Sequence, residues 1–435
     1  MAVRSSRALT LALLSALALI AVWNALHYPP GLGYDAVDHI AYAEGIRDGE
    51  GLPDGIGEYY TPPGFYALAA GAMSAGDSFG LGDPRRLAQL LNAALALGTA
   101  LLLLALAREL WPGRHVLHVA ALGFFVCSAV VLKAAAMFHP ETLDLFLSTL
   151  ALLLAARMIV RDDYRPLSAI ALGAALGAAQ LVRAFALWTF AVVLVALAVA
   201  ALADGGRRRR IVAAVAVAVA ATAAVAGPWY VYQSRSYTNP IFDRPQVQKP
   251  LWERRPAEFY VDPGLPELVT RPYRPSFENR FWPTVYAEGW GDWFGVFAWQ
   301  PNKGGPSAAA ERELTAQSLA GLLPTALAVA GWLWLLVRSA RRLLSRPELL
   351  LVALLPLAGL VGMLYFTVSY PTPDGDVIKA TYMLTTVPAW ALAFGLATER
   401  AARGRFALVL GVLLAVAALV SLRFAVYGSV AGGLL

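Results

Sequence analysis

Residues 87–107 read LAQLLNAALALGTALLLLALA, a stretch without a single charged side chain. A run of about 18 or more nearly uncharged apolar residues can cross the hydrocarbon core of a bilayer as a helix. Similar runs recur along the whole chain of 435 residues, of which 58% are hydrophobic and only 15% are charged. Soluble proteins average about 25% charged residues. We therefore expect an all-α integral membrane protein with a single transmembrane domain over residues 1–435.

The apolar runs predict about eleven transmembrane helices. The first covers about 8–26 and follows Arg4 and Arg7. No small-residue cleavage site comes after it, so we expect an uncleaved first helix and not a signal peptide. The other helices are expected near 84–107, 116–136, 142–159, 167–183, 185–203, 211–231, 317–337, 349–368, 377–398 and 406–426.

Arginine clusters at the short loops indicate the orientation of the chain. If the N-terminus is cytoplasmic, eleven helices place every such cluster on the cytoplasmic side, as the positive-inside rule requires. The net charge of +6 is explained by these arginines, which orient the helices in the membrane, so we expect no nucleic-acid partner. The bias to Ala, Leu, Val and Arg suggests a bacterial protein, hence one of the cytoplasmic (inner) membrane. The clusters are Arg108 with Arg114; Arg157, Arg161 and Arg165; Arg207 to Arg210; Arg338, Arg341, Arg342 and Arg346; and Arg400, Arg403 and Arg405.

Two long segments, 27–83 and 232–316, form large outer loops in this topology. Both are rich in Pro, Gly, Trp and Tyr, and aromatic residues favour the membrane interface, so we expect the loops to fold against the outer surface. Within the first loop, 36–47 is expected to form a short helix. The stretch 62–76 contains paired prolines and is short for a span, so we expect an interfacial helix there.

The first outer loop opens with two carboxylates, in the sequence GYDAVDHIAYAEGIRDGEGLP over 33–53. Asp35 stands where it could cap the helix over 36–47. Alternatively, desolvation near the membrane would raise the pKa of Asp35 or Asp38 and improve either one as a general base. Asp35, Asp38 and His39 could together ligate a divalent ion, but the spacing gives no support for a metal, and no cofactor is predicted.

Isolated cations make a second group of candidates on the outer side. Lys133 precedes the turn that contains His139 and Glu141, while Arg183 interrupts an apolar run and Lys379 opens a late helix. Charged side chains near membrane depth are costly and tend to be functional. Lone cations suit a phosphate. Snorkelling to lipid headgroups is the alternative for Arg183 and Lys379, and an ordinary helix start is the alternative for Glu141.

The second outer loop contains a tryptophan-rich stretch over 277–301. Trp290 and Asp292 could bind a sugar or an isoprenoid, although an aromatic belt at the membrane surface would also explain the tryptophans. The chain has no P-loop, no dinucleotide fingerprint, no zinc-spacing motif and no nucleophile elbow.

Taken together, these motifs resemble those of the polytopic GT-C glycosyltransferases, which include protein mannosyltransferases and bacterial aminoarabinose transferases. The likeness spans the whole layout of the chain, but the motifs are short, and we expect these 435 residues to hold no counterpart of the family's usual large soluble C-terminal domain. The matching elements are the acidic first loop (Asp35, Asp38, His39, Tyr42), the proline-aromatic end of that loop (YYTPPGFY, with Tyr60), the turn from His139 to Glu141, and Lys379 followed by Tyr382.

The resemblance implies transfer of a sugar from a polyprenyl-phosphate carrier to a glycan, lipid or protein acceptor on the outer face. It also implies a catalytic carboxylate in the first loop, either Asp35 or Asp38, with Asp35 slightly favoured. In that setting Arg183, Lys379, Lys133 and His139 would bind the donor phosphate. His39, Tyr42, Tyr60, Glu141, Trp290, Asp292 and Tyr382 would contact substrate.

A transporter or flippase for a lipid-linked sugar is the alternative function. Transporters often show internal repeats and polar sites near the membrane midplane. The chain shows no such repeat, and its polar candidates gather at the outer side.

Overall fold

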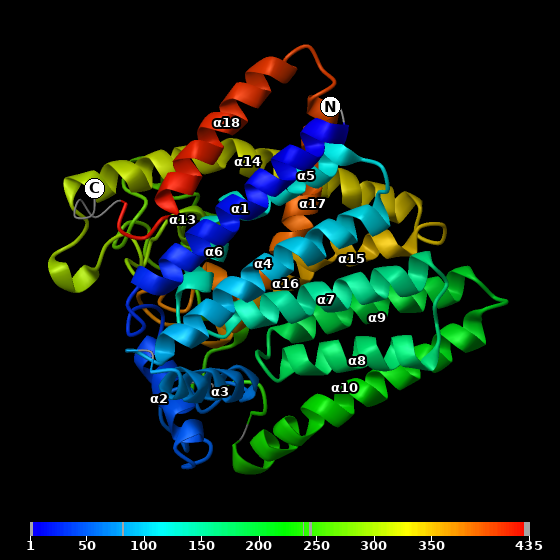
Figure 1. Cartoon of the computed structure of the whole chain (residues 1–435), viewed down its shortest axis with the longest axis horizontal. Helices are drawn as coiled ribbons and strands as arrows, with labels where there is room; N and C mark the ends of the chain where they lie inside the picture. Colours follow the sequence, from blue (N-terminus) through cyan, green and yellow to red (C-terminus); the bar gives the residue numbers. More distant parts are fainter. Residues whose placement is uncertain (1–2, 81, 238, 243–245, 430–435) are drawn as a thin grey trace.

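The computed structural model describes residues 3–80, 82–237, 239–242 and 246–429, and the described residues form an all-helical membrane domain (Figure 1). Eight of its helices are long and apolar enough to cross a membrane. They are α1 (Val3–His27), α4 (Arg85–Leu110), α7 (Glu141–Val160), α9 (Ala186–Ala203), α10 (Arg208–Ser236), α14 (Ala308–Arg341), η4 with α17 (Ala380–Thr386 and Val387–Ala401) and α18 (Ala407–Phe424).

Two expected helices are bent, which corrects the sequence prediction of continuous helices there. α5 (His115–Cys127) and α6 (Ala129–Ala136) meet at 53°, because Ser128 between them has an extended backbone. η3 (Pro347–Leu349) and α15 (Leu350–Ala353) meet α16 (Leu355–Ser369) at 40°. Pro356, at the start of α16, lacks an N–H and cannot continue the hydrogen-bond ladder of the preceding helix.

The remaining expected helix, α8 (Pro166–Gln180), is only 15 residues long and ends before Arg183, three residues earlier than predicted. It packs closely on α10 through Gly173, where a Cβ atom would lie 2.2 Å from the carbonyl oxygen of Ala218. Small residues allow such close approach between membrane helices. All eleven expected positions are thus helical, and the number of spans stays a prediction.

The first outer loop forms two short helices, α2 (Ala36–Arg47) and α3 (Gly64–Ser78). Both were expected, and α2 has the predicted bounds. Its apolar residues Ile40 and Ala43 are buried against Phe65 and Tyr66 of α3. The apolar side of α2 therefore packs on protein.

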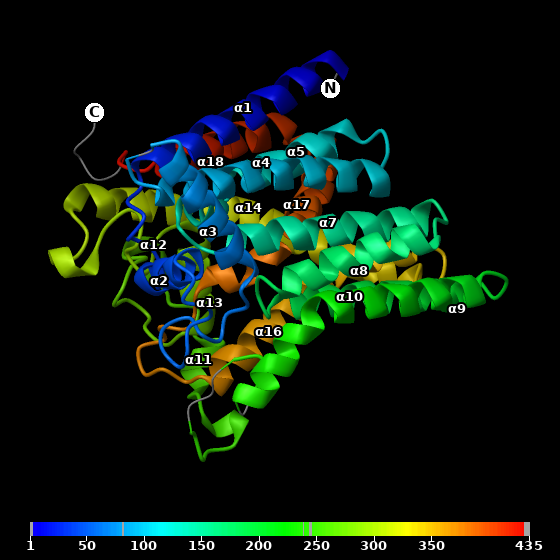
Figure 2. The same ribbon diagram turned by 60° about the horizontal axis from the view of Figure 1, so that its bottom comes forward.

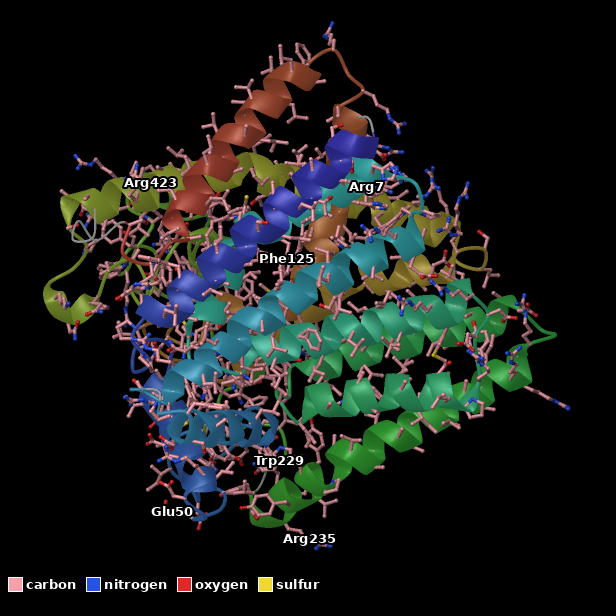
Figure 3. The ribbon with its side chains drawn as sticks, viewed as in Figure 1. Arg7, Glu50, Phe125, Trp229, Arg235 and Arg423 are labelled. Atoms are coloured by element: carbon pink, nitrogen blue, oxygen red, sulfur yellow. The ribbon has the colours of Figure 1, made fainter. Side chains whose placement is uncertain are left out.

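The second outer loop contributes α11 (Ala257–Val261), α12 (Glu267–Thr270) and α13 (Phe281–Trp290), with short 3₁₀ turns η1 (Leu251–Glu253) and η2 (Pro301–Lys303). Figure 2 shows α2, α11, α12 and α13 gathered at one end of the long helices. Glu50, beyond α2, and Arg235, near the end of α10, also lie toward this end (Figure 3).

Arginine-rich loops occupy the other end of the bundle. α7 begins at Glu141 beside the first outer loop, and its far end carries Arg157 and Arg161, which pair with Glu109 near the end of α4. A 20-residue helix is about 30 Å long, so these two ends are separated by about the thickness of a bilayer core.

Candidate functional site

Asp35 and Lys379 form an ion pair at the centre of the loop end. Asp35 precedes α2 in the left-handed region (φ 50°, ψ 26°), and its side chain caps no backbone N–H of the helix. Its Oδ2 atom accepts a hydrogen bond of 2.5 Å from Nζ of Lys379, which precedes η4. The Lys379 side chain is 9% exposed, but that of Asp35 is 43% exposed. The capping role considered for Asp35 is therefore wrong, and its carboxylate can still be reached by a ligand.

The two charges of this pair stabilise each other. Burial by itself would raise the pKa of Asp35, but the charge of Lys379 and its hydrogen bond outweigh burial and hold that pKa below its ordinary value. Burial opposes the charge of Lys379, while Tyr382 and Asp35 raise the pKa of the ammonium group. At neutral pH the pair is consequently ionised.

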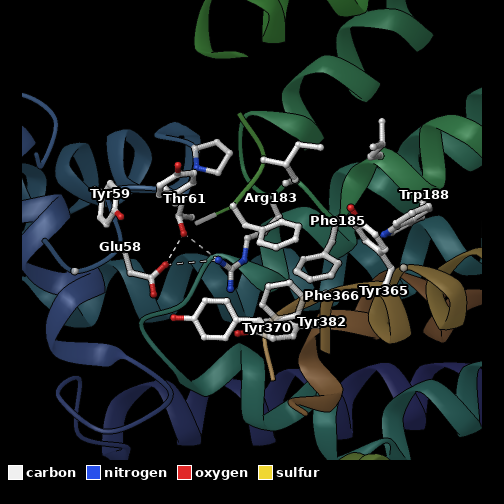
Figure 4. A pocket seen from close by; sticks show the side chains of 18 residues that line it. Glu58, Tyr59, Thr61, Arg183, Phe185, Trp188, Tyr365, Phe366, Tyr370 and Tyr382 are labelled. Atoms are coloured by element: carbon white, nitrogen blue, oxygen red, sulfur yellow. Dashed lines mark hydrogen bonds and ion pairs between the residues drawn. The ribbon is translucent and has the colours of Figure 1, made fainter. Parts of the chain in front are cut away.

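Arg183 forms a second buried ion pair next to the first. It lies in the turn between α8 and α9, and its Nε donates to Glu141 Oε1 at 2.6 Å. Its Nη1 donates to Thr61 Oγ1 at 3.1 Å and lies 3.7 Å from Glu58 Oε2 (Figure 4). Arg183 and Lys379 also share the ring of Tyr382, at 5.7 and 6.0 Å from its centroid, so the two cations belong to one cluster.

Two histidines complete this cluster. The rings of His39 and His139 lie 4.6 Å apart, edge to face, and both are buried. Burial lowers the pKa of His39 to about 4, so its imidazole is neutral at physiological pH. His39 Nε2, His139 Nδ1 and the Tyr42 hydroxyl are buried without a hydrogen-bond partner. Buried polar groups are normally paired, so these three unpaired atoms are unusual for a protein interior.

Asp38 lies at the rim of the site. Its side chain is largely exposed. The small part that is buried, together with the negative charges of Glu58 and Asp35, raises the pKa of Asp38. Of the two candidate bases, Asp35 is the one whose carboxylate is hydrogen-bonded to a cation of the cluster.

Glu58 is a member of this cluster for which the sequence suggested no role. One ligand atom each of Asp35, His39 and Glu58 lies within 4.8 Å of the others, close enough to hold a metal ion. The ion-binding trio considered from the sequence had Asp38 in place of Glu58. A neutral histidine with two carboxylates suits a divalent transition metal. The signal for Glu58 was its position just before the YYTPP motif.

Three predicted site residues lie outside this cluster. Lys133 is buried, donates to the Glu288 carboxylate and carbonyl, and lies 3.8 Å from Asp292. Asp292 accepts backbone hydrogen bonds, including 2.8 Å from Phe297 and 2.6 Å from Ala298. Because both charges are engaged inside the protein, the structure gives Lys133 and Asp292 internal structural contacts in place of ligand-facing positions.

Trp290 is likewise part of the core. Its indole N–H donates to Thr325 Oγ1 at 2.8 Å, and its ring packs so closely on Gly321 that a Cβ atom there would lie 2.6 Å away. The structure thus buries the face that was expected to contact substrate.

A cavity of about 370 Å³ opens beside Arg183 (Figure 4). One side is the end of the first outer loop from Gly57 to Pro62, which includes Tyr60. The other sides come from α9 and the turn before it, from α16 and η4, and from Ile241 and Phe242 of the second outer loop. Aromatic rings dominate the part between the helices: Phe185, Trp188, Tyr365, Phe366, Tyr370 and Tyr382. The cavity therefore joins a charged end, at Glu58 and Arg183, to an aromatic interior at the level of the membrane helices.

Comparison with solved structures identifies the architecture. ArnT from Cupriavidus metallidurans bound to undecaprenyl phosphate aligns with a TM-score of 0.51 at 16% identity, over 92% of this chain and 62% of that one. The Archaeoglobus fulgidus oligosaccharyltransferase in complex with Zn and sulfate aligns with a TM-score of 0.56 at 14% identity, over 97% of this chain and 54% of the other.

This chain has a GT-C fold. Another structure with this fold, archaeal AglB from Archaeoglobus fulgidus with an inhibitory peptide and a dolichol-phosphate, aligns over 98% of this chain and 56% of its own, with a TM-score of 0.53 and 13% identity. This chain thus spans only a little over half the length of these solved structures. No family model matches its sequence, and no curated protein matches it. At these identities, the likeness concerns the GT-C fold alone.

Proposed function

We propose that this protein is a membrane glycosyltransferase that moves a sugar from a polyprenyl-phosphate-linked donor to an acceptor on the outer face of the cytoplasmic membrane. The observation that carries this proposal is the meeting of Asp35, Lys379 and Arg183 beside an aromatic cavity between membrane helices. A carboxylate, two cations and an apolar cavity are the groups that such a transfer requires.

The cavity and the cations suit the two parts of the donor. The aromatic interior between α9 and α16 would hold the first isoprene units, and Arg183 at its charged end would bind the phosphate. Two solved GT-C-fold neighbours hold undecaprenyl phosphate and a dolichol-phosphate, which supports a lipid phosphate as the ligand class.

Asp35 is the proposed general base. An acceptor hydroxyl attacks the anomeric carbon, the bond between that carbon and the phosphate oxygen breaks, and the hydroxyl proton passes to Asp35. Arg183 and Lys379 stabilise the charge that develops on the leaving polyprenyl phosphate. When the phosphate takes hydrogen bonds from Lys379, Asp35 loses its strongest partner and becomes a better proton acceptor.

The charge balance of the cluster leaves room for a cation. Asp35, Glu58 and Glu141 contribute three carboxylates, against the two positive charges of Arg183 and Lys379. The donor phosphate would add further negative charge. Asp35, His39 and Glu58 would hold a divalent ion, which would supply the missing positive charge beside the phosphate.

The distribution of arginines supports the proposed outer-face location. The cluster lies at the end of α7 opposite Arg157 and Arg161, and arginine clusters mark the cytoplasmic side.

The decisive experiment compares Asp35→Asn with Asp38→Asn in proteoliposomes supplied with labelled undecaprenyl-phosphate sugars and bacterial membrane extract as acceptor. We expect Asp35→Asn to reduce labelled product by about 10²–10⁴-fold, the usual contribution of a general base. The matched carboxylate change Asp38→Asn should retain activity within about threefold, since Asp38 lies at the rim.

Two results would count against the proposal. Full transfer by Asp35→Asn would remove the assigned base. Movement of the labelled lipid across the vesicle without any new glycosidic product would point to the flippase alternative.

A further inference from the structure

A second buried network lies directly behind the proposed catalytic pair. The Tyr34 hydroxyl donates to the Glu288 carboxylate, and Lys133 donates to the same carboxylate oxygen. Glu288 is fully buried on α13 of the second outer loop, and the Lys133 side chain is 1% exposed on α6. Three segments that are far apart in the sequence therefore converge on one carboxylate.

This network touches the proposed site through Tyr34. The Tyr34 ring lies 5.4 Å from Nζ of Lys379 and packs edge to face on His139, with 6.0 Å between ring centroids. Tyr34 is also the residue before Asp35. One ring thus adjoins the lysine, the histidine and the backbone of the proposed base.

The backbone of Asp35 needs such an anchor. Its left-handed conformation (φ 50°) is uncommon for a residue with a Cβ atom, although aspartate tolerates it better than most, and contacts on either side help to hold it. Since the carboxylate caps no helix, the constraint must come from elsewhere. Lys379 holds the side chain on one side, and Tyr34, fixed by Glu288, holds the preceding residue on the other.

Glu288 is itself rigidly held. Its second carboxylate oxygen accepts the N–H of Phe294 at 3.1 Å, and its backbone carbonyl accepts a hydrogen bond of 3.0 Å from Lys133. Lys133 owes its position to the bend at Ser128, which turns α6 away from the axis of α5. The bend therefore has a consequence at the site, since it sets the position of the lysine that fixes Glu288.

We propose that Glu288 and Lys133 are positioning residues, which act through Tyr34 to hold Asp35 and Lys379 in their reactive geometry. The inference rests on the proposed glycosyl transfer and gives the second outer loop a part in it. None of the three residues needs to touch the donor, so their loss should affect the chemical step more than donor binding.

The test is Tyr34→Phe, which removes one hydroxyl and keeps the ring beside Lys379 and His139. The matched control is Tyr286→Phe on the same helix α13 as Glu288, because the Tyr286 hydroxyl also makes one hydrogen bond, to the Ser318 carbonyl at 2.6 Å. We expect kcat to fall about tenfold in Tyr34→Phe, with the KM for the donor and the melting temperature equal to those of the control. A tenfold loss corresponds to about 1.4 kcal/mol.

A second variant tests the same network from the other side. Glu288→Gln keeps an oxygen for the Tyr34 hydroxyl and should lose less kcat than Glu288→Ala at equal amounts of folded protein. Equal kcat in Tyr34→Phe and Tyr286→Phe would overturn the positioning role.

Asp35→Asn measured alongside separates the two proposals. Activity in Asp35→Asn refutes the base itself. An inactive Asp35→Asn together with a fully active Tyr34→Phe refutes only the positioning network.

Discussion

Nζ of Lys379 lies 2.5 Å from Oδ2 of Asp35, and the two residues are 344 positions apart in the chain. This pair joins the start of the first outer loop to the start of a late membrane helix. It also sets the protonation of Asp35, because burial alone would raise a pKa that Lys379 instead lowers. The first prediction concerns this effect.

Removal of Lys379 should shift the acidic limb of the pH–rate profile upward. In the wild type, the pKa of Asp35 lies below its ordinary value of about 3.9, so kcat/KM should be flat from pH 7 down to pH 5. In Lys379→Met, the lysine no longer offsets the effect of burial on Asp35. The pKa of Asp35 therefore rises, and kcat/KM should fall between pH 7 and pH 5. Lys379→Arg keeps a cation and should keep the flat profile. An unchanged profile in Lys379→Met would exclude Asp35 as the titrating base.

The same pair contributes to stability with a defined sign. A carboxylate whose pKa is lowered on folding stabilises the protein above its unfolded pKa, and this contribution is lost as the pH falls through the folded value. The Asp35–Lys379 contribution is therefore present throughout the neutral range.

Sequence patterns predicted much of this fold because the membrane imposes simple rules. Long uncharged runs located the helices, and the bounds of α2, Ala36–Arg47, agree with the prediction. Neither bend was predicted: a serine inside an apolar run, such as Ser128, carries no breaking signal, and the run over 349–368 was read as continuous despite Pro356.

The site was predictable only as far as single residues could be judged one at a time. Arg183 stood out because it interrupts an apolar run, and Lys379 because it opens a late helix. Lys133 looked equivalent, but it pairs with Glu288, 155 residues away, and no local pattern reveals such a contact. Asp35 resembled a helix cap because it directly precedes the helix over 36–47. Its left-handed backbone, which depends on tertiary contacts, could not be predicted from the sequence.

Arg183 and Glu141 should behave as a coupled pair. Arg183→Gln leaves the buried Glu141 carboxylate without its cation, and breaking a buried pair in this way costs about 3–5 kcal/mol. The double variant Arg183→Gln/Glu141→Gln removes both charges and should recover most of the lost thermal stability in detergent. Neither variant should transfer sugar, since the phosphate cation is gone in both. Recovered transfer in the double variant would show that Arg183 serves structure alone.

Divalent cations should stimulate transfer through Glu58. The ligand atoms of Asp35, His39 and Glu58 lie within 4.8 Å of one another, and the cluster has more carboxylates than cations. We expect EDTA to lower activity and Mn²⁺ to restore it, with Glu58→Gln requiring about tenfold more Mn²⁺ for half-maximal activity. Isothermal titration with Mn²⁺ alone gives an independent readout. Full activity in EDTA, with no heat of Mn²⁺ binding, would contradict this prediction. The excess negative charge of the cluster would then be neutralised by protonation of a carboxyl group.

The aromatic cavity should determine how well the protein uses the isoprenoid part of the proposed donor. Gly362 of α16 lies against Trp188, and a Cβ atom at this position would be 2.0 Å from the indole Nε1. Gly362→Ala therefore pushes the indole into the cavity and should raise the KM for a long polyprenyl donor about tenfold. Gly227→Ala on α10 is the matched control, because a Cβ atom there meets no neighbouring atom within 4 Å.

Chain length provides the internal comparison for this last prediction. The indole lies among the rings between α9 and α16, away from the charged end at Glu58 and Arg183. A donor with a chain too short to reach Trp188 should therefore bind equally well to Gly362→Ala and to the wild type, while the undecaprenyl donor should not. An equal rise in KM for both donors would contradict this prediction. It would mean that the substitution disturbs the phosphate site, which both donors share, and that the lipid chain lies elsewhere.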